Sequence, residues 1–147
     1  MEKFEGSEQG LTVADMEAFA TEWEITLPGE FIEFYLQHNG GYPPFDAVEG
    51  DEYVYAIDWF LPIKYGQLTI DRLLRENSGE GIDLKAMIPF AADPYDNLFV
   101  LSVAPADYGS IYVFEQENDS REPSSYRFVC SSFRDFITGF TNEYQDE

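Results

Sequence analysis

Residues 88–102 read IPFAADPYDNLFVLS, with an acidic, proline-containing stretch directly before an almost continuous apolar run. Three interpretations of the acidic stretch are open: a metal-binding loop, part of an active site, or a turn that leads into a strand. Its spacing lacks a full set of metal ligands, and Pro94, Asp96 and Asn97 are residue types common in turns. We therefore predict a turn in which Asp93 accepts hydrogen bonds from backbone amides ahead of it, followed by a buried strand.

Strands and helices are predicted on both sides of this turn. Apolar runs and alternating patterns predict strands over residues 53–63, 97–103, 110–115 and 126–130. Helical spacing of apolar residues predicts helices over residues 11–23, 28–39, 70–77 and 133–144. Thr12, Thr69 and Ser132 are the expected N-caps, and Gly40 is expected in a left-handed conformation after the second helix.

This order of elements indicates an α+β fold. We expect a largely antiparallel or mixed sheet, flanked by an N-terminal helical hairpin and a C-terminal helix. Residues 1–10 are expected to form a flexible tail, and residues 11–147 a single domain. Residues 41–52, rich in Gly, Pro and acidic side chains, are predicted to form a loop.

The composition limits the function. Of the 147 residues 44% are hydrophobic and 17% aromatic, enough for one well-packed core, and the formal net charge is −21. A field of this sign repels nucleic acid and anionic lipid and speeds the encounter with basic proteins, although acidity can also serve solubility alone. The single Cys130 excludes an intramolecular disulfide. No signal peptide or membrane-spanning run is visible, so the expected location is the cytoplasm.

No recognisable catalytic motif is present. His38 lies at the end of the second predicted helix, and no nucleophile elbow such as G-x-S-x-G occurs. Cys130 ends an apolar strand, where a thiol usually serves as a small apolar side chain. Phosphate-binding glycine motifs are missing, and the few basic residues argue against a nucleic-acid groove. We predict no enzymatic activity, no cofactor and no metal site.

The densest group of acids lies in and beside the predicted loop, at Asp46, Glu49, Asp51 and Glu52. These residues lack the spacing of a calcium-binding loop. Three interpretations stay open from the residues alone: a solvated loop, a surface that faces a basic protein, and a divalent-metal site. The residues therefore indicate an acidic, aromatic-rich α+β domain without visible catalytic apparatus.

Four motifs in the right order resemble the SUKH superfamily, which includes yeast regulators of cell-wall glucan synthesis and many bacterial toxin-immunity proteins. LPGEFIEFYLQHNGGYPP (27–44) resembles its first signature, and IPFAADPYDNLFVLS (88–102) its second. SIYVFE and VCSSFRDFITGF resemble the following strand and closing helix, so the resemblance covers about residues 12–142. The positions that match the two signatures are Leu27, Pro28, Asn39, Gly40, Gly41, Pro89, Phe90, Asp93, Asp96 and Asn97.

One of these positions departs from the family pattern. Relatives usually have Gly before Asn97, where this chain has Asp96. Gly there suggests a positive φ angle, and Asp tolerates that conformation better than most residues. We therefore predict a left-handed conformation at Asp96.

The resemblance implies a protein-binding domain, in many bacterial members an immunity protein that captures a toxin, often a nuclease. The acidic charge fits such a partner, because nucleases carry basic clefts for phosphates. The predicted partner-binding residues are Tyr42, Asp46, Glu49, Asp51, Glu52, Tyr53, Tyr55 and Asp58. Two alternatives remain: a regulatory interaction module, as the yeast relatives suggest, and a metal-dependent hydrolase that uses clustered carboxylates.

Overall fold

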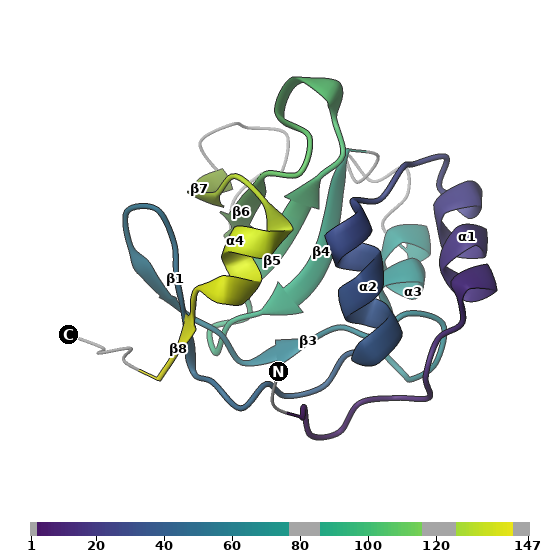
Figure 1. Cartoon of the computed structure of the whole chain (residues 1–147), viewed down its shortest axis with the longest axis horizontal. Helices are drawn as coiled ribbons and strands as arrows, with labels where there is room; N and C mark the ends of the chain where they lie inside the picture. Colours follow the sequence, from purple (N-terminus) through teal and green to yellow (C-terminus); the bar gives the residue numbers. More distant parts are fainter. Residues whose placement is uncertain (1–2, 77–85, 116–125, 143–147) are drawn as a thin grey trace.

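The computed structural model describes residues 3–76, 86–115 and 126–142, and its centre is a five-stranded sheet (Figure 1). Its strands, in spatial order, are β3 (Trp59–Phe60), β4 (Met87–Ala92), β5 (Leu98–Ser102), β6 (Ile111–Phe114) and β7 (Tyr126–Cys130). Each strand pairs antiparallel with its neighbour. The middle strand β5 is buried from Phe99 to Ser102, which explains its continuous apolar run.

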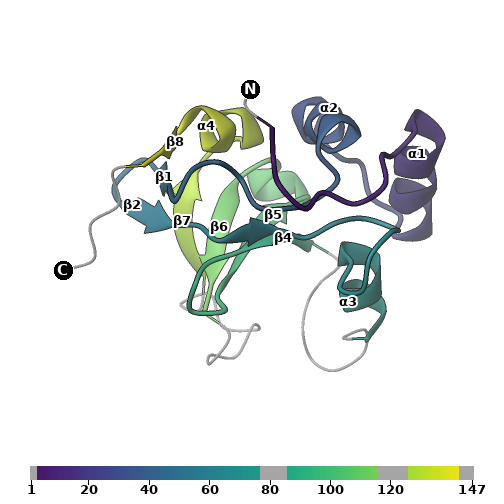
Figure 2. The same ribbon diagram turned by 90° about the horizontal axis from the view of Figure 1, so that it is seen from below.

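The described part of the chain contains four α-helices: α1 (Val13–Glu22), α2 (Gly29–Gln37), α3 (Ile70–Glu76) and α4 (Phe133–Thr138). Figure 2 shows α2 and α4 over one face of the sheet and α3 on the other side. The predicted caps are present: the Thr12 hydroxyl accepts from the Asp15 N–H, and Ser132 accepts from the Asp135 N–H. A short 3-10 helix, η1 (Pro105–Asp107), precedes β6. The molecule has the predicted α+β class, with helices at both ends of the chain.

Aromatic rings fill the space between the sheet and the helices α2 and α4. The ring centroid of Phe31 (α2) lies 5.0 Å from that of Phe133 (α4), and Phe90 (β4) lies 5.2 Å from Phe136 (α4). Tyr35 is fully buried and donates its hydroxyl to the Leu61 carbonyl oxygen at 2.8 Å, with the Phe90 carbonyl oxygen also in reach at 3.2 Å. Burial raises the pKa of this hydroxyl well above its usual value, so it remains a neutral donor inside the core.

A second, three-stranded sheet forms at one end of the molecule, in the order β2 (Val54–Ala56), β1 (Ala47–Glu49) and β8 (Phe140–Thr141). All its pairings are antiparallel. The strand predicted over residues 53–63 is therefore wrong as one element, because its two halves, β2 and β3, belong to different sheets. The Ile57 N–H donates to the Asp46 carbonyl, whereas the next amide, of Asp58, donates to Ala92 of β4. The predicted loop over residues 41–52 also contains β1.

The end of the last helix and the presence of the strand β4 also differ from the prediction. The last helix ends at Thr138 because the Glu49 N–H bonds to the Gly139 carbonyl at 2.7 Å, and the chain continues as β8. Strand β4 was not predicted, since Pro89 within it cannot donate to a ladder. The register of β4 against β5 shifts between Pro89 and Ala91, and this irregularity accommodates the proline.

The described residues of the expected N-terminal tail are packed against the domain. Phe4 is 2% exposed, and its ring contacts Phe34, His38 and Phe60. Burying a phenylalanine stabilises a fold by about 1.5–3 kcal/mol. Backbone hydrogen bonds of Glu5 with Tyr42 and of the Glu8 N–H with the Asn39 carbonyl hold the segment as well. The segment 3–10 therefore lies along the domain and forms part of its surface. None of the described helices is long and apolar enough to cross a membrane.

Candidate partner-binding surface

The Asn-Gly-Gly motif after α2 joins distant segments of the chain. The Asn39 side chain is buried, donates to the Gln9 and Ile63 carbonyls, and accepts from the Ile63 N–H at 2.8 Å. Gly40 has a φ of +75°, which confirms its predicted left-handed conformation. At Gly41 a Cβ would lie 2.6 Å from the Glu5 carbonyl oxygen, so only glycine allows this approach. The motif thus holds these segments together and fixes the backbone from which residues 42–45 follow.

The acidic turn between β4 and β5 is also structural. The Asp93 carboxylate accepts from the backbone N–H groups of Tyr95 (2.8 Å) and Asn97 (2.9 Å) and from the Asn97 side chain. This confirms the predicted turn. Asp96 has a φ of +67°, as predicted from the glycine of the family pattern. Within residues 3–76, 86–115 and 126–142, no three or more His, Cys, Asp or Glu side chains are grouped to hold a metal ion.

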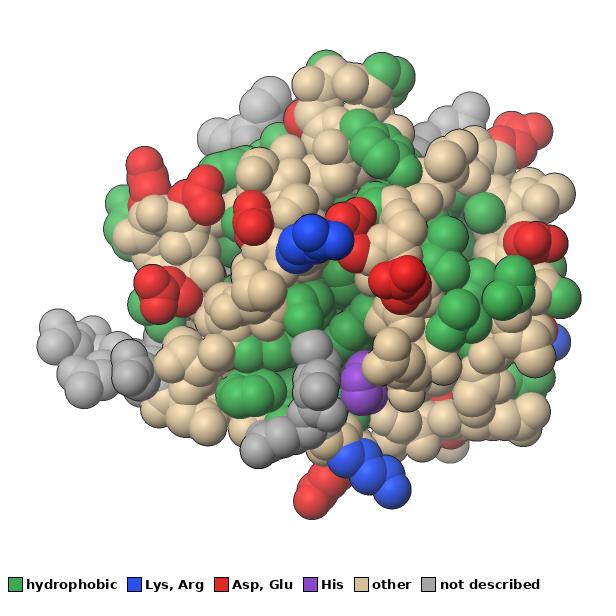
Figure 3. All heavy atoms as spheres, in the orientation of Figure 1, with side chains coloured by type: hydrophobic (Ala, Val, Ile, Leu, Met, Phe, Trp, Pro, Cys, Tyr) green, Lys and Arg blue, Asp and Glu red, His purple; other side chains and the backbone are tan. Residues whose placement is uncertain are grey.

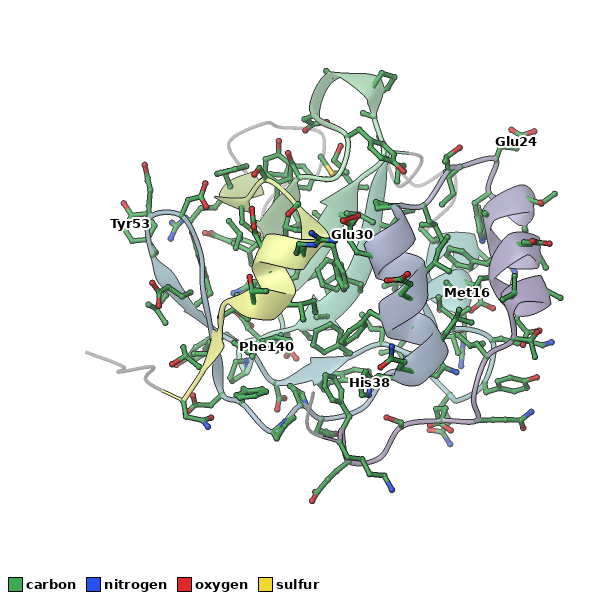
Figure 4. All side chains as sticks on the ribbon, in the orientation of Figure 1. Met16, Glu24, Glu30, His38, Tyr53 and Phe140 are labelled. Atoms are coloured by element: carbon green, nitrogen blue, oxygen red, sulfur yellow. The ribbon has the colours of Figure 1, made fainter. Side chains whose placement is uncertain are left out.

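Most of the predicted partner-binding residues lie on the β1–β2 hairpin. Its register pairs Val48 with Tyr55 and Glu49 with Val54. Exposed side chains along the strands and the turn are Glu49, Asp51, Glu52, Tyr53 and Val54. Figure 4 labels Tyr53 at the outer end of the hairpin, and Figure 3 shows acidic side chains gathered there.

The hairpin is attached to the main sheet through β7. The Asp51 N–H donates to the Val129 carbonyl at 2.8 Å, and the Tyr55 hydroxyl donates to the Phe128 carbonyl at 3.2 Å. Burial raises the pKa of the Tyr55 hydroxyl, and the nearby Arg127 partly opposes that rise. Both bonds end on backbone carbonyls of β7, which do not change rotamer as a side-chain acceptor could. They therefore fix the position of the hairpin, and of its acidic side chains, relative to the main sheet.

The remaining predicted residues lie away from the tip. Asp46 and Asp58 are exposed where the hairpin meets the main sheet, next to the Ile57–Asp46 hydrogen bond. Tyr42 is 51% exposed and lies beside Trp59 of β3, with ring centroids 6.4 Å apart. The structure therefore divides the predicted set into a hairpin part, its base, and a part at the β3 edge.

A groove at the β3 edge includes residues that sequence reasoning did not select. It has a volume of about 510 Å³, and its lining includes Tyr42, Trp59, Gly66, Leu68 and, from the N-terminal segment, Glu8. Glu8 was missed because residues 1–10 were assigned to a tail. The signal that could have found this segment is Phe4, an isolated aromatic residue among polar ones.

The sequence matches the model of the SMI1/KNR4 family (SUKH-1) over residues 10–139. The chain belongs to the SUKH-1 family. No individual curated protein matches it. This membership supports a general role in protein binding, in immunity or regulation, and the family is generally non-enzymatic.

The histidine and the cysteine of this SUKH-1 domain are both engaged in packing. The His38 ring stacks on Phe4 with centroids 4.6 Å apart, and burial lowers its pKa. Cys130 is 1% exposed, and burial raises the pKa of its thiol to about 12, which keeps it protonated. The Cys130 thiol is thus protonated at neutral pH, and the His38 ring is held by its contacts with Phe4 and Phe34.

Proposed function

We propose that this SUKH-1 protein is a cytoplasmic, non-enzymatic immunity protein that captures a basic toxin, such as a nuclease, through the acidic surface of residues 41–58. The observation that most supports this proposal is the β1–β2 hairpin. It presents Glu49, Asp51 and Glu52 together with exposed apolar groups, and it is hydrogen-bonded to the main sheet. Family membership supports the protein-binding role. The choice of a toxin and of this surface is the proposal.

The hairpin offers both features that a protein interface requires. Tyr53 is 57% exposed and Val54 42% exposed, and such side chains become anchors when a partner covers them. The surrounding carboxylates attract a basic partner over distances of about 8–10 Å and discriminate against acidic ones. A nuclease cleft is basic because it binds phosphates, so an acidic surface of this kind complements it.

The test is calorimetry at low salt with a basic nuclease toxin, chosen from the neighbouring genes where one of them encodes such a protein. We expect saturable binding to the wild type, and binding at least about ten-fold weaker to the double variant Asp51→Lys/Glu52→Lys. The matched control is Glu17→Lys/Glu33→Lys, which makes the same change of net charge at exposed positions on α1 and α2. This control should bind nearly as well as the wild type.

Two results would contradict the proposal. Absence of binding at low salt would contradict the proposal that the partner is a toxin. Equal loss of affinity in the hairpin and control variants would show that net charge alone attracts the partner, and the hairpin would then not be the binding surface.

A further inference from the structure

Three extended segments place an acid and two aromatic rings in one row beside β3. Glu5 and Tyr42 exchange two backbone hydrogen bonds, of 3.0 and 2.7 Å, and Gly41 and Phe60 exchange two more, of 3.0 and 2.8 Å. In this antiparallel register Tyr42 lies opposite Trp59, in agreement with the contact between their rings. Directly opposed residues project to the same face, so Glu5, Tyr42 and Trp59 form a cross-strand row.

This row borders the groove described above. Tyr42 and Trp59 line it from the sheet side, and Leu68, 41% exposed, lines it from the segment before α3. The Glu8 side chain also lines the groove and lies against Gly66, whose Cβ would be 3.2 Å from the Glu8 carboxyl carbon. In Figure 2 the N-terminal segment and β3 run across the side that faces the viewer. The groove thus combines aromatic rings with a carboxylate.

We propose that this groove binds the guanidinium or ammonium group of an arginine or lysine side chain on the protein partner. A cation within about 6 Å of an indole or phenol ring is attracted by the negative face of the ring. A nearby carboxylate adds a charge-assisted hydrogen bond. Glu8 lines the groove and Glu5 stands next to Tyr42 in the row, so both interactions are available together.

Two basic side chains close to the groove residues in sequence are already engaged. The Arg72 guanidinium donates to the Gln67 carbonyl at 2.7 Å and pairs with Glu76 at 2.8 Å. The Lys64 ammonium lies 2.8 Å from the Asp15 carboxylate and 5.2 Å from the Tyr65 ring. Neither Lys64 nor any arginine is among the residues that line the groove. The negative field of the whole chain further favours a cation from outside. This inference rests on the proposed function for the identity of the partner, but it concerns the part of the surface at the β3 edge, which includes Tyr42, and not the hairpin.

The experiment titrates the full-length protein with N-acetyl-arginine methylamide and observes the indole N–H signals by NMR. The uncharged control is N-acetyl-citrulline methylamide, which has nearly the same shape. The signal of Trp59, assigned with Trp59→Phe, should shift saturably with the arginine compound only. The signal of Trp23 should stay constant, since Trp23 does not line the groove.

Two variants that each remove one negative charge test whether the Glu8 carboxylate takes part in arginine binding. Glu8→Gln should weaken arginine binding by up to about five-fold, the range expected for a charge pair at an exposed position. Glu17→Gln removes the same charge from an exposed position on α1 and should leave the affinity unchanged. Equal shifts with citrulline, or equal weakening in both variants, would overturn the inference.

The outcome for the groove can be separated from the outcome for the hairpin. If Asp51→Lys/Glu52→Lys abolishes toxin binding and Glu8→Gln leaves it unchanged, the proposed function is supported. The inference that the groove binds a basic side chain of the partner is then wrong. If the arginine compound binds saturably at Trp59 but no toxin binds, the groove is supported as a site for basic side chains. The proposal that the partner is a toxin is then contradicted.

Discussion

At the scale of single residues, Asn39 shows how much one side chain organises in this fold. Its amide holds the N-terminal segment through Gln9 and the β3–α3 connection through Ile63. Because the Asn39 side chain is buried, leaving one of its polar groups unpaired would cost about 1–3 kcal/mol. The sequence marked Asn39 as a motif residue but could not show these partners, because they lie 30 and 24 positions away.

Asp96 yields a prediction about backbone strain. Because its φ is +67°, Asp96→Val should be less stable than Asp96→Gly by about 1–2 kcal/mol, measured by urea unfolding. The same pair of substitutions at Glu49, an exposed position in β1, should show the reverse order, since valine favours strands. Equal stability of the two Asp96 variants would mean that the turn relaxes to another conformation.

His38 yields a prediction about pH. Burial lowers its pKa in the folded state, so the unfolded chain binds a proton more readily as the pH falls through about 6.5. The contribution of neutral His38 to stability is therefore complete above that pH and is lost as the pH falls towards its folded pKa. Relative to His38→Phe, the wild type should lose unfolding free energy between pH 8 and pH 5.5. A difference that stays constant over this range would refute the prediction.

At the scale of elements, the sequence predicted those whose signal is local. The helices with capping residues and the strands β5, β6 and β7 lie where their patterns indicated. The division of residues 53–63 could not be predicted, because the side-chain alternation does not record that the chain changes from one sheet to another at Ile57. The first half of the hairpin was predicted as part of a loop and the second half as part of a strand. The groove depends on a segment that had been predicted to be a flexible tail.

The β1–β2 hairpin yields a prediction about its open edge. The bonds from Gly50 to Tyr53 and from Ile57 to Asp46 place hydrogen-bonded pairs at every second position, so the Val54 N–H points away from β1. Relative to alanine at the same position, proline should therefore be tolerated at 54. At 55 it should cost about 1–3 kcal/mol, because a ladder bond is lost. Urea unfolding of the four variants measures this difference, and equal costs at both positions would contradict the register.

At the scale of the whole molecule, the net charge of −21 affects folding and binding in opposite directions. Repulsion among like charges opposes the compact state, whereas attraction to a basic partner depends on the same charges. Salt screens both effects.

We therefore expect the Tm to rise and the affinity for the toxin to fall as sodium chloride increases from about 10 mM to about 300 mM. Differential scanning calorimetry and titration calorimetry in the same buffers measure the two quantities. A Tm that falls over this range would show that attractive ion pairs, such as Lys64 with Asp15, outweigh the repulsion.

The pairing of β1 with β8 has a consequence for the order in which the molecule assembles. Val48 pairs with Phe140, which is far from it along the chain, whereas β4 pairs with β5, β5 with β6 and β6 with β7, in sequence order. Closing the longer loop costs more conformational entropy, so we expect β8 to join the small sheet after the meander of β4–β7 has formed. The amides of the small sheet should exchange with deuterium sooner than those of β5. A partner bound to the hairpin would slow that exchange and so mark its own site.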